Sequence, residues 1–255
     1  MKTLIQTITQ YFAIHSPGGV PMQVLIDIVA VVAAYLFGSI PFGLLVVKAI
    51  SGRDIRQVES GRTGGTNAMR AAGLGAGLLT AILDIFKSAA TVWVARALTT
   101  TEWIHVLAPI AAIVGHNHSI FLIERDENGR IRLRGGAGGA ASLGGSFGLW
   151  WPSIFIILPL GFGIWYGIGY ASVTTMSVGL MSFIIFAIRA ALGLSPWEYA
   201  LYGLLAEVLL VLALRPNIKR LLNGTERLHG WRAKRQEKKM REDAKQEPGP
   251  GKGPA

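Results

Sequence analysis

The chain of 255 residues contains no cysteine and few charged residues. Without cysteine it can form no disulfide, no thiolate metal site and no thioester intermediate. Charged residues make up 16% of the chain, whereas 51% of the residues are hydrophobic and the mean hydropathy is +0.43. Soluble domains carry about 25% charged residues. Since the apolar residues also come in long blocks, the sequence predicts an integral membrane protein.

Acidic residues are scarcer than basic ones, and the net charge is +10. In a soluble protein such an excess of Lys and Arg would indicate nucleic acid as a partner. Here the basic residues flank apolar blocks, so orientation in a lipid bilayer explains them better. We therefore expect membrane lipid, and no nucleic acid, around this chain.

Seven segments are predicted to be helical, one of them short, so the predicted fold class is an all-α integral membrane protein with seven transmembrane helices. The spans are expected at about 24–50, 73–97, 103–123, 151–168, 172–192 and 197–214, and the short helix at 137–149. Ser39-Ile40-Pro41 should bend the first span, because proline lacks a backbone donor. Asn128-Gly129, between alternating residues, predicts a small β-hairpin with a two-residue turn.

The basic residues also predict an orientation. They concentrate in 48–72, in 124–136 and from 215 onward, whereas the connections TTTEW and GLSPW contain none. Lys and Arg are enriched in cytoplasmic loops. The sequence thus predicts an N-terminus outside, a C-terminus in the cytoplasm and an odd number of spans.

Three parts are expected along the chain. Residues 1–23 are interpreted as an N-terminal extension on the membrane surface, 24–228 as the polytopic membrane domain, and 229–255 as a basic cytoplasmic tail. The tail is rich in Lys, Arg and Glu and then in Pro and Gly, so it is predicted to be disordered.

The first polar segment reads RQVESGRTGGTNAMRAAG, residues 56–73. It offers hydroxyls, an amide and guanidinium groups from Ser60, Arg62, Thr66, Asn67 and Arg70. Glycines between them let the backbone approach a ligand closely. This mixture suits a phosphate better than a metal ion, since Glu59 is the only acid. The alternative is a polar turn whose arginines serve only the membrane orientation.

The second polar segment combines GHNHSIF (115–121) with RGGAGGAASLGG (134–145), half of which is glycine. The two histidines have no Asp, Glu or Cys at ligand spacing, so no metal site is expected. A glycine-rich turn that enters a helix N-terminus offers free N–H groups and the positive end of the helix dipole to an anion. The alternative is a helix-packing seam of small residues. Both interpretations can be true: the first glycines would form the anion-binding turn, and the rest of the stretch would form the helix-packing seam.

The third polar segment, RPNIKRLLNGTERLHG (215–230), follows the last span directly. It forms a basic cluster interleaved with amides and one acid: Arg215, Asn217, Lys219, Arg220, Asn223, Glu226 and Arg227. The alternative to a binding site is a juxtamembrane basic helix attracted to anionic lipid.

Two charges lie inside the second predicted span. Asp84 and Lys87 are three residues apart, which places them on one face of a helix. Isolated charges are unfavourable inside a bilayer. We therefore expect the two side chains to pair with each other.

Together these segments resemble the bacterial membrane glycerol-3-phosphate acyltransferases that use acyl phosphate. GSIPFGLL (38–45) and ESGRTGGTNAMRAAG (59–73) are similar to the family's first signature, GHNHSIF and RGGAGGAAS to its second, and NIKRLLNGTE (217–226) to its third. The resemblance covers about 30–228, and three signatures in order are far more specific than any one. The family fold, seven helices with an outside N-terminus and a cytoplasmic active site, agrees with the orientation predicted from charge.

The resemblance implies transfer of an acyl group from acyl phosphate to the 1-hydroxyl of glycerol 3-phosphate, without a cofactor, at the cytoplasmic face of the bacterial cell membrane. By resemblance the catalytic candidates are Ser60, Arg70, His116 and Asn217. The candidates for substrate binding are Arg62, Thr66, Asn67, Arg134, Gly135, Gly136, Gly138, Gly139, Ser142, Lys219, Arg220 and Glu226. The glycines would hold the acyl phosphate. The oligomeric state stays open, with a monomer as one alternative.

Five departures from the family pattern concern the signatures. The V-A-T that follows G-G-K-G becomes Gly139-Ala140-Ala141-Ser142. The lysine of G-G-K-G is Ala137 here, a histidine before the third signature is Leu214, the asparagine of G-S-G-N is Arg62, and the aromatic-Pro after the first histidine is His118-Ser119. Arg134 and Arg62 can replace the missing cation, although not isosterically. The alternatives are a divergent homologue with a changed acceptor or no activity, and a small-anion transporter, which would also need glycine-rich breaks and intramembrane charges.

Overall fold

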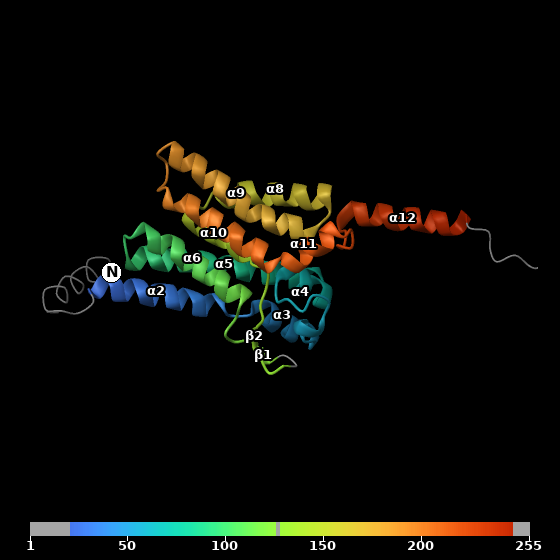
Figure 1. Ribbon diagram of the computed structural model, residues 1–255, viewed down its shortest axis with the longest axis horizontal. Coiled ribbons are helices and arrows are strands. Elements are labelled where there is room, and N and C mark those ends of the chain that lie inside the picture. Colours follow the sequence, from blue (N-terminus) through green and yellow to red (C-terminus); the bar gives the residue numbers. More distant parts are fainter. Residues whose placement is uncertain (1–20, 126–127, 247–255) are drawn as a thin grey trace, which may run out of the picture.

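The protein is a bundle of helices whose long axes run mainly in one direction (Figure 1). The computed structural model describes residues 21–125 and 128–246. Its helices are α2 (Met22–Gly38), α3 (Phe42–Ser51), η1 (Ile55–Gln57), α4 (Gly65–Ala72), α5 (Leu74–Leu98), α6 (Glu102–Asn117), α7 (Gly139–Leu149), α8 (Ser153–Ile168), α9 (Ala171–Ala191), α10 (Glu198–Ala213), α11 (Arg215–Leu222) and α12 (Gly230–Gln246). A small antiparallel sheet pairs β1 (Ile123–Arg125) with β2 (Ile131–Leu133). The predicted N-terminal extension, 1–23, lies almost entirely outside the described residues.

Several helices are long and apolar enough to cross a membrane. The segment made of α2 and α3 meets this condition, as do α5 and α9, and α10 and α11 meet it together, bent by 66°. Large apolar side chains cover the outside of the bundle, and Phe155 and Phe162 on α8 have exposed fractions of 69% and 65%. Such a surface is suited to lipid rather than water. The predicted helical architecture with apolar spans is confirmed, whereas the number of seven crossings stays a prediction.

The first span is broken at Ser39-Ile40-Pro41, as the sequence predicts. The break frees backbone carbonyls that a continuous helix would use, and inside a membrane these need partners. The hydroxyl of Ser119 donates to the Ser39 carbonyl at 2.5 Å, and the ammonium of Lys87 donates to the Ile40 carbonyl at 3.0 Å. The bend is thus stabilised by side chains from α5 and from the segment after α6.

The chain after α6 differs from the prediction in two respects. The third span was expected to reach residue 123, yet the helix ends at Asn117, because the Ser119 N–H pairs with the Arg134 carbonyl at 2.9 Å. The hairpin is present, but the predicted two-residue turn is wrong, since Arg125 pairs with Ile131. This register is set at the base of the hairpin, where the Arg134 N–H donates to the Leu122 carbonyl, rather than by the turn residues.

The second half of the glycine-rich stretch is a helix-packing seam, as predicted for that half. A Cβ atom on Gly144 would collide with the backbone carbonyl of Ile85 on α5, and one on Gly145 with the hydroxyl of Tyr202 on α10. The missing side chains therefore let α7 approach both neighbours to backbone distance.

The C-terminal tail is helical over α12, so the prediction of disorder is wrong there. Lys, Arg, Glu and Ala are strong helix formers, and Lys238 and Glu242 pair at 3.7 Å one turn apart. Trp231 also packs against Tyr166 on α8, with ring centroids 6.4 Å apart. Residues 247–255 lie outside the described part, and the division of the chain at 228 and 229 stays a prediction.

The three basic segments gather at one end of the bundle, where Figure 1 shows α4, the small sheet and α11. Two further arginines lie at the opposite end, where the sequence predicted almost no positive charge. Arg96 donates to the Leu149 carbonyl at 2.7 Å and to the Tyr199 hydroxyl at 2.8 Å. Arg189 stacks 4.0 Å from the centre of the Trp150 ring. Both side chains therefore have partners within the bundle.

The variant Gly144→Ala is expected to lower the melting temperature in detergent. Its methyl group meets the Ile85 backbone, which cannot rotate away, and overpacking of this kind costs about 1–3 kcal/mol. Gly163→Ala on α8 is the matched control, because nothing lies within 4 Å of its added Cβ and alanine favours the helix. Equal melting temperatures for the two variants would contradict the close α5–α7 contact.

Candidate active site

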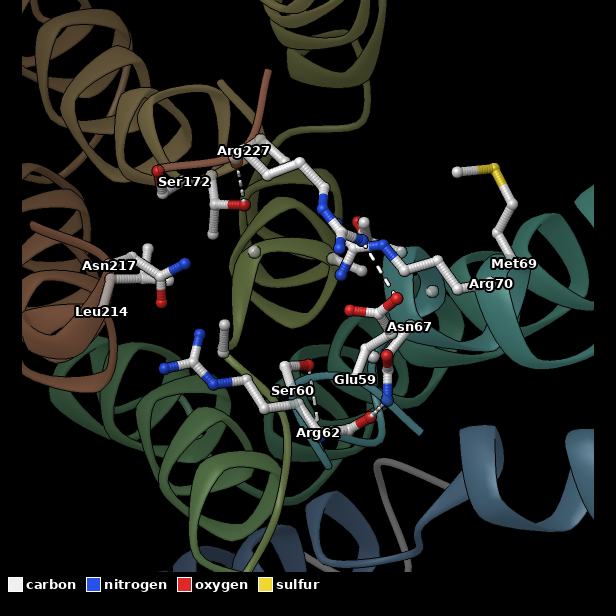
Figure 2. Close-up of a pocket in the computed structure, with 18 of the residues that line it drawn as sticks. Glu59, Ser60, Arg62, Asn67, Met69, Arg70, Ser172, Leu214, Asn217 and Arg227 are labelled. Atoms are coloured by element: carbon white, nitrogen blue, oxygen red, sulfur yellow. Dashed lines mark hydrogen bonds and ion pairs between the residues drawn. The ribbon is translucent and has the colours of Figure 1, made fainter. Parts of the chain in front are cut away.

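A cavity of about 710 Å³ lies at the end of the bundle where the three polar segments meet. Its wall combines the first polar segment, the end of α6, the starts of α7 and α9, and residues 214–229. Figure 2 shows side chains from these elements pointing toward one shared space. A second cavity of about 440 Å³ lies beside the small sheet and the end of α10. Ser60 and Arg62 line both cavities.

Guanidinium groups dominate the wall of the larger cavity, which is lined by Arg62, Arg70, Arg220 and Arg227. The carboxylates that pair with them are Glu226, 2.9 Å from Arg220, and Glu59, 3.1 Å from Arg227. Asp84 also lines the wall, but the buried Lys87 pairs with it at 2.8 Å, so four guanidinium groups against the two carboxylates Glu59 and Glu226 leave an excess of positive charge. A cavity lined by one sign of charge attracts ligands of the other sign, so the site suits an anion.

Arg62 stands between the two cavities. Its guanidinium donates to the Ala213 carbonyl at 2.6 Å, at the C-terminal end of α10, where the helix dipole favours a cation. Burial lowers the pKa of Arg62, and the nearby Arg220 lowers it further, yet a guanidinium stays charged in proteins. The result is a fixed positive charge held by a helix end.

The first polar segment is folded around the side chain of Asn67. Its amide nitrogen lies within hydrogen-bond distance of the carbonyls of Ile55, Val58 and Arg62, at 3.1, 2.9 and 2.9 Å. Glu59 has a φ of 49°, and within the described residues it is the one non-glycine residue with positive φ. Such backbone is unfavourable unless its surroundings hold it, and Asn67 does so. The amide predicted to bind substrate therefore shapes the loop.

Glu226 connects three elements at the wall. Its carboxylate accepts hydrogen bonds from Asn217 at 2.9 Å, from Arg220 at 2.9 Å and from Ser172, at the start of α9, at 3.1 Å. Burial alone raises the pKa of Glu226, but these three donors outweigh burial and lower it overall. The ionised carboxylate thereby orients the amide of Asn217 and the guanidinium of Arg220.

The glycine-rich turn crosses directly over the end of α6. The Gly136 N–H donates to the His116 carbonyl at 2.8 Å, and a Cβ on Gly136 would occupy the position of the His116 ring. Gly138 then begins α7 with a φ of +89°, which favours glycine. The first residues of α7, Gly139 and Ala140, line the larger cavity. The N-terminus of α7 therefore faces the cavity, as an anion site requires.

Three buried side chains that contact one another, Asp84, Lys87 and His116, support this turn. The Lys87 ammonium lies 2.8 Å from Asp84 Oδ1 and 3.0 Å from His116 Nδ1, and both charged side chains are 1% exposed. The predicted Asp84–Lys87 pair is confirmed, and His116 joins it. His116 Nδ1 also lies 3.4 Å from Asp84 Oδ1, farther than from the ammonium. With the charged ammonium as the donor at 3.0 Å, Nδ1 accepts and the ring proton is on Nε2. That nitrogen lies beside Gly136, in a ring that lines the cavity.

Residues 28–224 match the family model described as glycerol-3-phosphate acyltransferase. The chain belongs to the glycerol-3-phosphate acyltransferase family. A member from Thermus thermophilus is 40% identical over 78% of this chain and 94% of its own, and one from Rubrobacter xylanophilus is 35% identical over 82% and 98%. The protein is therefore an enzyme, an acyltransferase.

The crystal structure of PlsY (YgiH), an integral membrane glycerol 3-phosphate acyltransferase, has a similar fold. Its glycerol 3-phosphate form superposes with a TM-score of 0.69 at 29% identity, covering 80% of this chain and 96% of PlsY. Its lysophosphatidic acid form gives 0.67 at 27% identity, covering 80% and 95%. With its own apolar spans, the acyltransferase is thus a membrane protein as well.

The acyltransferase brings most predicted site residues together. Those that line the larger cavity are Ser60, Arg62, Thr66, Asn67, Arg70, His116, Gly138, Gly139, Asn217, Arg220 and Glu226. Arg134, Gly135 and Gly136 line the smaller cavity instead. Arg134 is also held by Glu124 on β1, at 2.5 Å. It is therefore not a cation of the larger cavity.

Two predicted residues line neither cavity. Ser142 is fully buried within α7, where its carbonyl accepts the hydroxyl of Tyr202 at 2.6 Å. Lys219 is exposed on α11, on a different side of the helix from the lining residues Asn217 and Arg220. Both residues belong to a sequence motif that runs along a helix. Only some residues of each motif lie on the helix face that lines the cavity, and these two do not.

Several lining residues of the acyltransferase are absent from the site residues predicted from the sequence, namely Glu59, Ser172, Thr175, Arg227 and His229. Ser172 and Thr175 begin an apolar helix, and nothing in their sequence surroundings distinguishes them. Arg227 and His229 follow directly after the third signature, and their charge and chemistry were the available signal.

The variant Lys87→Met is expected to destabilise the acyltransferase by about 3–5 kcal/mol, because it leaves the Asp84 carboxylate buried without its partner. The double variant Asp84→Asn/Lys87→Met should recover part of this loss. Thermal unfolding of both variants in one detergent measures the difference. A double variant less stable than Lys87→Met would show that the ion pair is not what the single variant disrupts.

Proposed function

We propose that this protein transfers an acyl group from acyl phosphate to the 1-hydroxyl of glycerol 3-phosphate, giving lysophosphatidic acid and inorganic phosphate. This reaction begins phospholipid synthesis. The observation that carries the proposal is the anion-attracting cavity, which four guanidinium groups line together with Ser60 and Asn217. Both substrates are anions, and PlsY, which has a similar fold, has glycerol 3-phosphate and lysophosphatidic acid forms.

The proposed chemistry needs positioning and charge stabilisation more than an activated side chain. The hydroxyl oxygen of glycerol 3-phosphate attacks the acyl carbonyl carbon, the bond from that carbon to the phosphate oxygen breaks, and the hydroxyl proton ends on the departing phosphate. Acyl phosphate is already activated, so a correct approach and stabilised negative charge supply the acceleration. Arg70, Ser60 and Asn217 would hold the acceptor.

The donor phosphate would lie at the glycine-rich turn. The N-terminus of α7 at Gly138 and Gly139 borders the larger cavity, and its free N–H groups and helix dipole favour a phosphate. The N–H at His116 Nε2 would donate a hydrogen bond to an oxygen of the reacting groups and keep its proton. No metal or organic cofactor is part of this scheme.

Compensation by arginine supports activity in spite of the departures from the family signatures. Ala137 and Leu214 line the same cavity as Arg62 and Arg220. Arg62 is held by the C-terminal end of α10. A cation is therefore available in the cavity where Ala137 stands at the position of the family's lysine. A guanidinium offers phosphate two parallel donors, which a lysine cannot.

We propose further that seven segments cross the cytoplasmic membrane of a bacterium, with the N-terminus outside and the cavity on the cytoplasmic face. The gathering of the basic segments at the cavity end supports this orientation. Arg96 and Arg189 at the other end do not oppose it, because the former donates to backbone carbonyls and the latter stacks on a ring. A monomer would suffice, since one chain supplies every group named in the cavity.

Small-anion transport is the weaker alternative. A transporter needs a polar path that continues from the cavity to the other side of the membrane. The bundle contains a buried apolar cluster that includes Val106, Ile113 and Phe186. Buried hydroxyls also lie in the bundle, but Ser146 pairs with Ser182, and Tyr202 donates to the Ser142 carbonyl. The packing favours a site that opens at one end.

Purified protein given acyl phosphate and glycerol 3-phosphate is expected to release phosphate and form lysophosphatidic acid. The variant Ala137→Lys should lower the rate, because a fifth cation would repel the arginines that already line the wall. Gly163→Ala on the lipid-facing helix α8 is the control and should keep the wild-type rate. A well-folded sample without turnover would contradict the proposed reaction, and a sharp increase with Ala137→Lys would contradict compensation by arginine.

A further inference from the structure

The segment Thr225–His229 lies beyond residues 28–224, which match the family model, yet it forms part of the cavity wall. Its path is fixed at both ends. The Thr225 N–H donates to the Arg220 carbonyl at 2.8 Å, and the His229 N–H donates to the Gly169 carbonyl at 2.7 Å. The segment therefore spans from the end of α11 to the turn between α8 and α9.

We infer that Arg227 and His229 are further substrate-positioning residues for glycerol 3-phosphate: Arg227 exchanges Glu59 for the substrate phosphate, and His229 holds Arg70 in place to bind the same phosphate. This inference rests on the proposed acceptor substrate. Both residues come from outside the family signatures, and they act at the cavity in which the signature lysine and histidine are replaced by Ala137 and Leu214.

Arg227 is available to a ligand because its present partner is weak. The Arg227 and Glu59 side chains are 58% and 41% exposed, and ion pairs at such exposure contribute little. Figure 2 shows the guanidinium groups of Arg227 and Arg70 close together above Glu59. Two neighbouring guanidiniums repel each other, and a phosphate dianion between them would replace repulsion by two charge-assisted contacts.

The closeness of Arg227 shifts the pKa values of both Arg70 and Glu59. Burial lowers the pKa of Arg70, and the charge of Arg227 lowers it further. The pKa of Glu59 is lowered by the hydrogen bond and the charge of Arg227, so the carboxylate is ionised at neutral pH and competes with an incoming anion. Substrate phosphate must therefore displace Glu59 from Arg227.

His229 acts through Arg70. Its Nε2 lies 3.2 Å from an Arg70 guanidinium nitrogen. Since a guanidinium only donates, Nε2 accepts and the proton is on Nδ1, so the ring is neutral in this contact. Charged groups that face the ring are Arg70 on α4 and, on its own segment, Arg227 and Glu226.

The pH dependence of this contact has a definite sign. Burial lowers the pKa of His229, and the charges of Arg70 and Arg227 lower it further, although Glu226 opposes them. The ring is therefore neutral at and above pH 7. When the pH falls through this lowered pKa, the ring takes up a proton, loses its acceptor and repels Arg70.

Comparison of Arg227→Gln with Glu59→Gln in the full-length protein separates substrate binding from a structural ion pair. Arg227→Gln is expected to raise the KM for glycerol 3-phosphate about tenfold, with the KM for acyl phosphate unchanged. Glu59→Gln should leave the KM for glycerol 3-phosphate unchanged or lower it, because it frees Arg227. An equal increase in both variants would overturn the inference, since both lose the same pair. Arg241→Gln on α12, exposed and away from the cavity, is the control.

For His229 the informative variants are Leu and Gln. His229→Leu should raise the KM for glycerol 3-phosphate, and His229→Gln should restore it, because the glutamine oxygen can accept from Arg70. As the pH falls, the KM of the wild type for glycerol 3-phosphate should rise more than the KM of His229→Gln. The ratio of the two KM values at each pH is the quantity to compare, because protonation of the substrate affects both proteins equally. His105→Gln, at the opposite end of the bundle, should keep the wild-type profile. A wild-type profile in His229→Gln would overturn the role of His229.

Calorimetric titration of glycerol 3-phosphate into the full-length protein, without an acyl donor, separates this inference from the proposed reaction. Binding to the wild type that weakens about tenfold in Arg227→Gln and in His229→Leu supports the inference, whatever the donor. Binding that is equal in the wild type and both variants overturns the inference and leaves the acceptor in place. A folded wild type that does not bind glycerol 3-phosphate overturns both.

Discussion

The rest of the site depends on the contacts that the buried ammonium group of Lys87 makes. This side chain is 1% exposed and reaches three separate elements: Asp84 on its own helix, the Ile40 carbonyl at the break in the first span, and His116 at the end of α6. A charge inside a bilayer is tolerated only when such partners surround it, so the positions of these elements are coupled. The backbone carbonyl of His116 in turn accepts from the Gly136 N–H. One cation therefore connects the first span, α5, α6 and the glycine-rich turn.

Above this support, the anion-attracting wall is built from guanidiniums that each have a local partner. Arg62 is held by the end of α10, Arg220 by Glu226 and Arg227 by Glu59. Partners of this kind keep the charges oriented before a ligand arrives, which reduces the reorganisation that binding requires. They also balance like charges that would otherwise repel one another. The weakest of these contacts, at Arg227, is the one most readily exchanged for a ligand.

The glycine-rich stretch serves two purposes along its length, and both follow from the missing side chains. At Gly136 and Gly138 the backbone passes over α6 and begins α7 toward the cavity, and at Gly144 and Gly145 it packs against α5 and α10. The stretch carries no cation of its own except Arg134, which Glu124 holds at the smaller cavity. The guanidinium groups that line the larger cavity together with the turn therefore come from other elements, and Arg62 lines both cavities.

The sequence by itself determined the apolar helices, the bend at Ser39-Ile40-Pro41, the Asp84–Lys87 pair and the three polar segments, because these depend on composition and on contacts a few residues apart. It also carried the family membership, through ordered signatures. Tertiary structure alone decided which motif residues face the cavity: it turned Ser142 and Lys219 away, used Asn67 to fold a loop, and brought Arg227 and His229 opposite Glu59 and Arg70. The contacts of Arg227 with Glu59 and of His229 with Arg70 join residues more than 150 positions apart in the chain. Local sequence patterns contain no information on which distant residues meet in space.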